Sequence, residues 1–283
     1  RDVAVLVTGP SGGRMGKVHN MIEALPLARH ARIVFSDADV VASPALLAAT
    51  SQAFSEGCDA VYASPYVLRV RGLADGLFAY AFNHGFSCSS AFLYNAGVMR
   101  AYAGAWMGFT RPGLERLGGL EPFTRVPADD FALGEAARRA GMRIGLLRVI
   151  AELQETTCGL ADAFAHFYKW AVVIRGASFP IFGVLLVHAG LLGAFAVGAA
   201  CAAAEGTLWP AALYAAGCGA RALGALLQDA AVLGRPLPLW LYPLIPVLDL
   251  GQLTLWAAAL AARRFHWRGK AYRLKAGGRL EVV

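Results

Sequence analysis

The first 178 residues alternate short apolar runs with polar and glycine-containing turns, whereas three long apolar runs follow them. Runs of Val, Ile and Phe between polar residues predict short buried strands. Such runs occupy 3–7, 31–35, 60–64, 104–111 and 144–150. Segments with apolar residues at helical spacing lie between them, at 18–27, 43–56, 112–118 and 131–140. Strands that alternate with helices of this length predict an α/β sheet.

The turn after the strand at 31–35 carries Asp37 and Asp39, separated by one alanine. Open α/β sheets bind ligands at the carboxyl ends of their strands. Two carboxylates at this spacing can hold a Mg²⁺ ion together with the phosphates of a substrate. The alternative is a solvated turn, because aspartate is common in turns.

Two further pairs of polar residues stand at helix starts. Lys17 and Asn20 lie three residues apart, so both face the same way and either contact a nucleotide or simply begin the helix. Asp129 and Asp130 precede the helix at 131–140, where the helix dipole favours acidic residues. The functional interpretation makes Asp130 a general base, with Asp129 beside it. The glycines before Lys17 do not form a P-loop, because no Ser or Thr follows this lysine.

The long apolar runs predict a membrane domain. Hydrophobic residues make up 57% of the chain and charged residues 16%, below the about 25% charged residues of ordinary soluble domains. Each run exceeds the about 20 residues that cross a bilayer. The runs lie at 179–204, 207–233 and 237–262. We expect a globular domain at 1–160, an amphipathic interfacial segment at 161–178, transmembrane helices at 179–262 and a basic tail at 263–283.

Charge suggests how such a chain is oriented. The basic tail is expected to be cytoplasmic by the positive-inside rule. A cytoplasmic globular domain then requires an even number of crossings, and we expect the third run to be re-entrant or interfacial because it contains Pro243 and Pro246. The net charge of +7 fits an anionic partner, either phospholipid headgroups or a nucleotide. Nucleic acid is not expected, because no globular segment interleaves basic and aromatic residues.

Two aromatic segments allow alternative interpretations. His166, Lys169 and Trp170 lie just before the apolar runs, where Trp and basic residues are expected as membrane anchors. The aromatic residues between 73 and 87 predict a surface along the membrane, an acceptor groove or simply core.

Four features occur in one order along the chain. They are Lys-x-x-Asn before the Asp-x-Asp strand, Gly-Gly-Leu at 118–120, Ala-Asp-Asp at 128–130 and His-x-x-Lys-Trp at 166–170. Together they resemble inverting glycosyltransferases of the GT-A fold, most closely the ceramide glucosyltransferase family with its bacterial hopanoid glycosyltransferase relatives. A fifth segment, 265–278, looks like the Trp-Arg-x-Gly-x-Tyr-Arg-Leu tail of that family.

The resemblance implies a Rossmann-like GT-A domain followed by an α-helical membrane domain. It implies transfer of a hexose from a UDP-sugar to the hydroxyl of a lipid acceptor, of ceramide or hopanoid type, with Mg²⁺ or Mn²⁺. The protein would be integral to a membrane, such as the bacterial inner membrane, with its catalytic domain in the cytoplasm. Carried over by position, Asp37 and Asp39 bind the metal and the nucleotide, Asp130 is the base, and Lys17 and Asn20 match donor-site positions.

His166, Lys169 and Trp170 match the family motif that holds the diphosphate and lines the acceptor site. Two of them depart from it: Lys169 stands where Arg is usual, replacing a bidentate fork with a point charge, and His166 replaces Gln or Arg. The family's first aspartate lies on a strand that would precede Arg1, so we expect the GT-A domain to be N-terminally incomplete, as part of a longer protein.

Two alternatives remain open from the sequence. A polysaccharide synthase shares most of these motifs but is expected to carry a longer membrane part and a Gln-x-x-Arg-Trp motif. A membrane scaffold with a degenerate, non-catalytic transferase domain is the other, since the first strand is missing and Lys169 departs from the motif.

Overall fold

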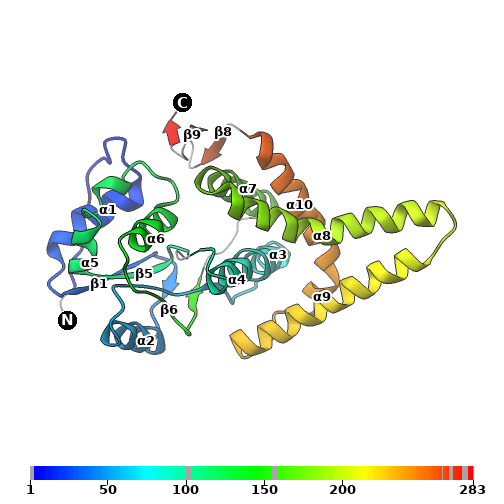
Figure 1. Ribbon diagram of the computed structural model, residues 1–283, viewed down its shortest axis with the longest axis horizontal. Helices are drawn as coiled ribbons and strands as arrows, with labels where there is room; N and C mark the ends of the chain where they lie inside the picture. The colour runs from blue at the N-terminus through cyan, green and yellow to red at the C-terminus, as the bar shows by residue number, and fades with distance from the viewer. Residues whose placement is uncertain are drawn as a thin grey trace.

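The computed structural model describes residues 3–99, 103–154, 159–262, 264–267, 270–275 and 280–282. Figure 1 shows an α/β part formed by the first half of the chain and a helical part formed by the second. Two helices of the helical part, α8 (Phe179–Ala204) and α9 (Trp209–Leu233), project from the body as a hairpin.

The α/β part alternates strands and helices, as the sequence predicts. Its helical segments are α1 (Gly16–Ala24), η1 (Leu25–Leu27), α2 (Pro44–Ser55), α3 (Leu73–Tyr80), the π-helical η2 (Ala81–Ser87), α4 (Cys88–Asn95), α5 (Arg111–Arg116), η3 (Glu121–Phe123) and α6 (Asp129–Arg139). Its strands are β1 (Arg32–Ser36), β2 (Val40–Val41), β3 (Ala60–Tyr62), β4 (Pro65–Val67), β5 (Trp106–Thr110), β6 (Ile144–Leu146) and β7 (Ala151–Leu153).

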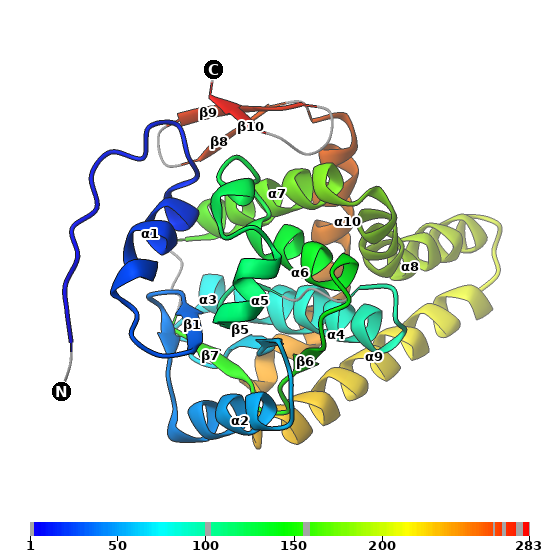
Figure 2. The ribbon, with the colours of Figure 1, turned by 60° about the vertical axis from the view of Figure 1, so that its left-hand side comes forward.

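The main sheet has the order β1-β5-β3-β6 and mixes strand directions. β5 is antiparallel to both of its neighbours, whereas β3 and β6 are parallel. Helices cover both faces: Leu46 and Phe54 of α2 pack with Val61 on one face, and Val18 of α1 packs with Leu133 of α6 on the other. Figure 2 shows the sheet between these layers. In this strand order β1, which precedes the Asp-x-Asp turn, lies at the edge of the sheet.

Local sequence signals explain several helix ends. Ser43 caps α2, its Oγ accepting a hydrogen bond from the Leu46 N–H at 3.1 Å, as expected for Ser followed by Pro. Thr110 caps α5 through the Gly113 N–H at 3.1 Å. α6 ends before Gly141, whose φ of +65° suits glycine.

Two strand predictions are wrong in part or in full. Residues 3–7 form no strand, and Val3, Val5 and Val7 are 82%, 90% and 89% exposed. A strand needs a neighbour for its backbone hydrogen bonds, and no described strand pairs with this run. The strand predicted at 144–150 is confirmed only at Ile144–Leu146, which is β6. The next strand, β7, begins after this range and lies in another sheet, between β2 and β4.

The helical part packs onto the α/β part through a shared hydrophobic core. It comprises α7 (Leu160–Ala177), α8, α9, η4 (Leu239–Leu244), α10 (Ile245–Ala261), β8 (Arg264–Trp267), β9 (Lys270–Leu274) and β10 (Leu280–Val282). Val172 of α7, Phe182 of α8 and Leu255 of α10 belong to the same buried cluster as Leu133 of α6. Arg175 of α7 donates to carbonyl oxygens at the end of α10, which fixes these two helices together.

The C-terminal tail forms a small antiparallel sheet that lies over α7, with the order β10-β9-β8 (Figure 2). Phe265 is buried and stacks on Tyr272, with ring centroids 5.5 Å apart. Five residues of the tail segment 265–278 lie outside the described residues: Arg268, Gly269, Ala276, Gly277 and Gly278.

Two helical segments of the described chain are long and apolar enough to cross a membrane. They are α9 and the combined segment Leu239–Ala261. Within the most apolar 18-residue stretch of each, only 6% of α9 and 28% of Leu239–Ala261 is buried. The third predicted run begins with the 3-10 turn η4, which contains Pro243. The backbone of this run is thus irregular at its start, where the prolines lie.

Candidate active site

Helix starts and one turn bring five charged side chains together beside the end of β1. Lys17 comes from the first turn of α1, Asp37 and Asp39 from the turn after β1, and Asp129 and Asp130 from the first turn of α6. Lys17 Nζ lies 2.8 Å from Asp37 Oδ1. Burial alone lowers the pKa of Lys17, yet the charges of the three nearest carboxylates outweigh it and raise this pKa. We call these five residues the carboxylate cluster.

Asp130 is held by backbone amides. Its Oδ2 accepts from the Gly104 N–H at 2.7 Å, and its Oδ1 accepts from the Phe131 N–H at 2.7 Å. The Gly104 carbonyl in turn accepts from Lys17 Nζ at 2.7 Å. A Cβ at Gly104 would lie 2.9 Å from Asp130 Cβ and 3.0 Å from Lys17 Nζ. Only glycine allows Lys17 and Asp130 to approach the backbone here.

Asp129 has a different environment from its neighbour. Its Oδ2 is buried and has no hydrogen-bond partner among the described residues. Burial, and then the charge of Asp130, raise the pKa of Asp129 to about 7. This carboxyl therefore exchanges a proton near neutral pH, where a general acid or base is most effective.

Asp39 experiences the negative charge of its neighbour. Burial and the charge of Asp37 raise the pKa of Asp39, so a cation beside these two carboxylates would be stabilised. Among the described residues no three His, Cys, Asp or Glu side chains are arranged to hold a metal ion by themselves. The pair fits a metal that takes its remaining ligands from substrate phosphates, as Mg²⁺ commonly does.

Tyr62 of β3 lies against the same cluster. Its ring is buried, its hydroxyl has no partner among the described residues, and burial together with the charges of Asp130 and Asp129 raises its pKa. The hydroxyl is thus a neutral donor near both acids. Strand alternation places Tyr62 on the face of Ala60 and opposite to Val61, but this alternation alone does not indicate which face carries a site. Neither Tyr62 nor Gly104 is among the residues proposed from sequence.

Asn20 is separate from this group. Its side chain is exposed, and its Oδ1 accepts from Thr8 Oγ1 at 2.8 Å. No described interaction joins it to Lys17 or to the aspartates. The structure thus brings together five of the predicted site residues but not this one.

His166, Lys169 and Trp170 lie on α7 in an aromatic cluster with the rings of α3 and η2. The His166 and Trp170 rings are 4.6 Å apart and perpendicular, and Lys169 Nζ lies 5.8 Å from the Trp170 ring centroid. Burial, and then the charge of Lys169, lower the pKa of His166 to about 4. At neutral pH the imidazole is uncharged, so Lys169 is the cation of this motif.

A buried apolar cluster contacts both the motif on α7 and the turn that carries Asp37. The Asp37 N–H donates to the Ala105 carbonyl at 2.9 Å, and Ala105 belongs to the buried cluster on which Phe167 and Trp170 pack.

The aromatic residues at 73–87 are mostly core. Phe78, Tyr80 and Phe82 are buried, whereas Phe86 is partly exposed and stacks near Trp170, with centroids 5.3 Å apart. The core interpretation therefore holds for most of this stripe.

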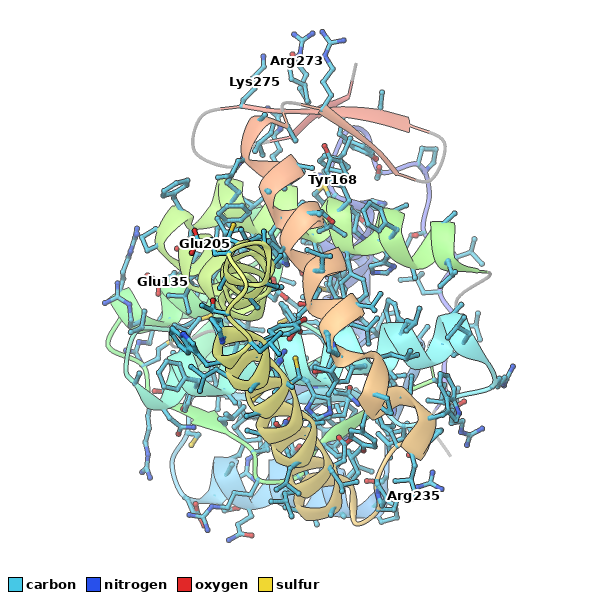
Figure 3. All side chains as sticks on the ribbon, turned by 90° about the vertical axis from the view of Figure 1, so that its right-hand side faces the viewer. Glu135, Tyr168, Glu205, Arg235, Arg273 and Lys275 are labelled. Carbon is cyan, nitrogen blue, oxygen red and sulfur yellow. The ribbon has the colours of Figure 1, made fainter. Side chains whose placement is uncertain are left out.

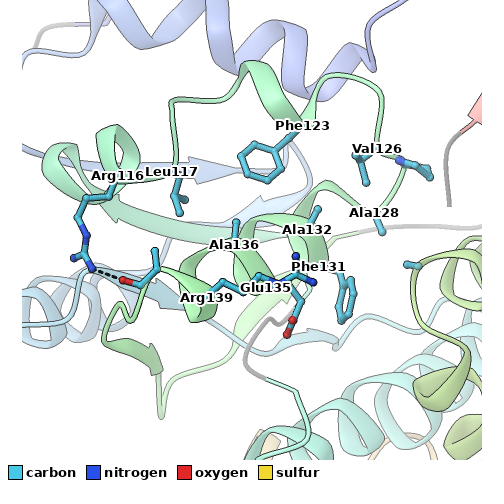
Figure 4. A pocket seen from close by; sticks show the side chains of 13 residues that line it. Arg116, Leu117, Phe123, Val126, Ala128, Phe131, Ala132, Glu135, Ala136 and Arg139 are labelled. Atoms are coloured by element: carbon cyan, nitrogen blue, oxygen red, sulfur yellow. Dashed lines mark hydrogen bonds between the residues drawn. The ribbon is translucent and has the colours of Figure 1, made fainter. Parts of the chain in front are cut away.

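A pocket of about 780 Å³ lies between α5, η3 and α6 (Figure 4). Its floor includes Phe123 and Ala132, and Arg116, Glu135 and Arg139 surround it. No member of the carboxylate cluster lines it, so we do not assign the donor to this pocket.

The arrangement of acids at a strand end agrees with a comparison of the whole sequence. The model of glycosyl transferase family 21 matches residues 1–280. The chain belongs to glycosyl transferase family 21. Family 21 membership confirms the glycosyltransferase resemblance found in the sequence, and it does not address the hopanoid relatives.

Other comparisons add less about this family 21 chain. A mannosyltransferase from Pyrobaculum calidifontis, PcManGT, solved with GDP-Man and Mn²⁺, is 23% identical, with a TM-score of 0.46 over 88% of this chain and 67% of that one. No curated protein sequence matches the chain.

Proposed function

We propose that this family 21 chain is a membrane-bound inverting glycosyltransferase that moves a hexose from a UDP-sugar to the hydroxyl of a lipid, of ceramide or hopanoid type. The observation that carries the proposal is the carboxylate cluster. Within a glycosyltransferase family, it provides two acids at a strand end, a second pair at a helix start and one lysine between them. Such a set can bind a charged donor and accept a proton.

In the proposed reaction, Asp130 takes the proton of the acceptor hydroxyl as its oxygen attacks the anomeric carbon, and the bond to the diphosphate breaks with inversion. Two backbone N–H groups orient the Asp130 carboxylate. Beside it, the Asp129 Oδ2 and the Tyr62 hydroxyl oxygen are buried. Lys17 places a positive charge near the leaving diphosphate.

Asp37 and Asp39 are the residues we propose to hold Mg²⁺ or Mn²⁺. A divalent cation bound there supplies positive charge that stabilises the departing diphosphate. Lys17 Nζ lies 2.8 Å from Asp37 Oδ1, so this lysine adds a positive charge beside the proposed metal-binding carboxylates. On α7, Lys169 and Trp170 are proposed to face the diphosphate and the acceptor, as their motif implies.

The projecting hairpin supports a membrane location. α8 and α9 extend from the body with Glu205 at the turn between them (Figures 1 and 3). Arg235 lies where α9 returns to the body, and Arg273 and Lys275 lie on the tail sheet (Figure 3). The Leu239–Ala261 segment is also long and apolar enough to cross, but Leu255 of α10 lies in the same core as Val172 of α7. We therefore propose that α8 and α9 are the two crossings, that α10 stays with the body, and that the catalytic part and the tail share the cytoplasmic side.

Activity on defined lipids tests the proposal. The full chain is placed in nanodiscs that contain ceramide, supplied in turn with several UDP-sugars, and the extracted lipids are weighed by mass spectrometry. We expect ceramide carrying one hexose, no product after EDTA treatment, and recovery with Mn²⁺ or Mg²⁺. A polymer would indicate a polysaccharide synthase, and the absence of product with every sugar and lipid alcohol tested would indicate a non-catalytic scaffold.

A further inference from the structure

A cavity of about 190 Å³ lies between η2, α7 and α10, away from the carboxylate cluster. Its volume is many times the 10–15 Å³ that one water molecule needs. Its walls are almost wholly apolar and include Phe86, Phe167, Trp170 and Trp256. An apolar ligand such as an alkyl chain suits such walls better than a sugar or a nucleotide.

Gln252 of α10 is the polar side chain in this wall. Its Nε2 is buried and has no hydrogen-bond partner among the described residues. Its amide packs on Gly85 of η2, where an added Cβ would lie 2.9 Å from Gln252 Oε1. A buried amide without a hydrogen-bond partner destabilises the fold, and a ligand oxygen that accepts its N–H would remove this cost.

The rim of the cavity indicates how the ligand enters. Leu160, Phe164 and Val247 line the cavity and are exposed large apolar side chains. Such a rim is unfavourable in water and suits entry from the acyl-chain region of a bilayer.

The cavity also borders the motif on α7. Trp170 forms part of its wall and packs perpendicular to His166 at 4.6 Å. Phe167, another wall residue, packs on the buried cluster that contains Ala105, whose carbonyl accepts the Asp37 N–H. The cavity wall and the backbone next to Asp37 therefore contact the same buried apolar cluster.

We propose that this cavity holds one alkyl chain of the lipid acceptor, with an oxygen next to that chain accepting a hydrogen bond from Gln252 Nε2. The inference rests on the proposed function and identifies how the acceptor is held. The chain length and a carbonyl or hydroxyl beside it would then select the acceptor, whereas the carboxylate cluster acts on its terminal hydroxyl.

Gly251 allows the cavity to be filled with little disturbance. It lines the cavity, and a Cβ built on it meets no other atom within 4 Å. Gly219 of α9 has equally open surroundings but does not line the cavity. Gly251→Phe is therefore the test variant and Gly219→Phe its matched control. Gln252→Met keeps the side-chain length and removes the amide.

The experiment uses the full chain in phosphatidylcholine nanodiscs with a ceramide that carries a diazirine in its N-acyl chain. After irradiation we expect labelled peptides from η2, α7 and α10, at least tenfold less label in Gly251→Phe, several-fold less in Gln252→Met, and wild-type label in Gly219→Phe. Excess unlabelled ceramide should compete. Label that survives in Gly251→Phe, or maps outside these elements, or is absent altogether, would overturn the inference, as would a failure of ceramide to displace it.

Hexose transfer measured on the same samples separates this inference from the proposed function. Cavity labelling without transfer from any UDP-sugar contradicts the proposed function alone. Transfer to ceramide that Gly251→Phe leaves unchanged, with unchanged label, contradicts the cavity assignment alone.

Discussion

Asp129 and Asp130 are adjacent in sequence, yet their environments differ. Asp130 accepts two backbone N–H groups at 2.7 Å, whereas Asp129 has a buried oxygen without a described partner and a pKa raised to about 7. The backbone at Gly104 and the burial of the α6 N-terminus create this difference. The two acids are therefore expected to respond differently to the same substitution.

Asp130→Asn should reduce hexose transfer by about 10²–10⁴-fold, the typical contribution of a general base, because the amide cannot take the acceptor proton. Binding of the UDP-sugar, measured by calorimetry, should persist. The control is Glu135→Gln, which removes the ion pair between Glu135 and Arg138 on the same helix. It should keep wild-type transfer. If Asp130→Asn abolishes donor binding instead, this residue belongs to the donor site.

Asp129→Asn should change how stability depends on pH. Because the folded protein raises the pKa of Asp129 from 3.8 to about 7, the native state holds its proton more tightly, so stability falls as pH rises from about 4 to 7 and is flat above. The variant lacks this decline. We expect it to gain stability relative to wild type between pH 5 and pH 8 in thermal unfolding. Parallel curves would show that Asp129 is not buried as described.

At the scale of elements, η2 connects the α/β part to the helical part. Asn83 bonds both the N–H and the carbonyl of Val67 in β4 at 2.9 Å. The next residues, His84 and Gly85, face the helices: His84 Nε2 lies 3.0 Å from Asp229 Oδ1 of α9, and Gly85 contacts α10. A π-helical segment often marks a functional site, and here one turn contacts every element around the cavity.

α9 and α10 are joined by a partly buried ion pair that makes a clear stability prediction. Arg221 Nη2 donates to Asp249 Oδ1 at 2.7 Å, and Asp249 is buried. Asp249→Ala should cost about 3–5 kcal/mol of unfolding free energy, because Arg221 loses its partner. Arg221→Met combined with Asp249→Leu should recover most of this loss. Thermal unfolding in one detergent measures both.

The exposed Lys275–Glu281 pair provides the contrast. These side chains are 2.9 Å apart on the tail sheet, and Glu281→Gln should leave the free energy of unfolding almost unchanged because water screens an exposed pair. A similar cost for Asp249→Ala and Glu281→Gln would contradict the buried position of the α9–α10 pair.

At the scale of the whole molecule, the projecting hairpin exposes several large apolar side chains to its surroundings. Val197, Trp209, Leu223 and Leu227 are exposed large apolar residues on α8 and α9. An apolar surface this extensive needs a membrane or a partner. Membrane fractions washed with alkaline carbonate should therefore retain the chain, and only detergent should release it. Release by carbonate would contradict crossing by α8 and α9.

The sequence by itself determined the elements whose signals are local. Ser43 followed by Pro44 predicts the start of α2, Gly141 predicts the end of α6, and the apolar run before Asp37 predicts β1. The positions of the acids and the order of the family motifs are also properties of the sequence alone, and they were sufficient to indicate a glycosyltransferase family.

Only the tertiary structure decided which of these residues meet. Lys17, Asp37 and Asp129 converge because α1 and α6 cover one face of the sheet at the end of β1, and contacts between segments so far apart leave no local periodicity. The same reason explains why residues 3–7 read as a buried strand but are exposed. A strand's burial, a carboxyl's pKa and a cavity beside Trp170 depend on neighbours that the local pattern does not contain.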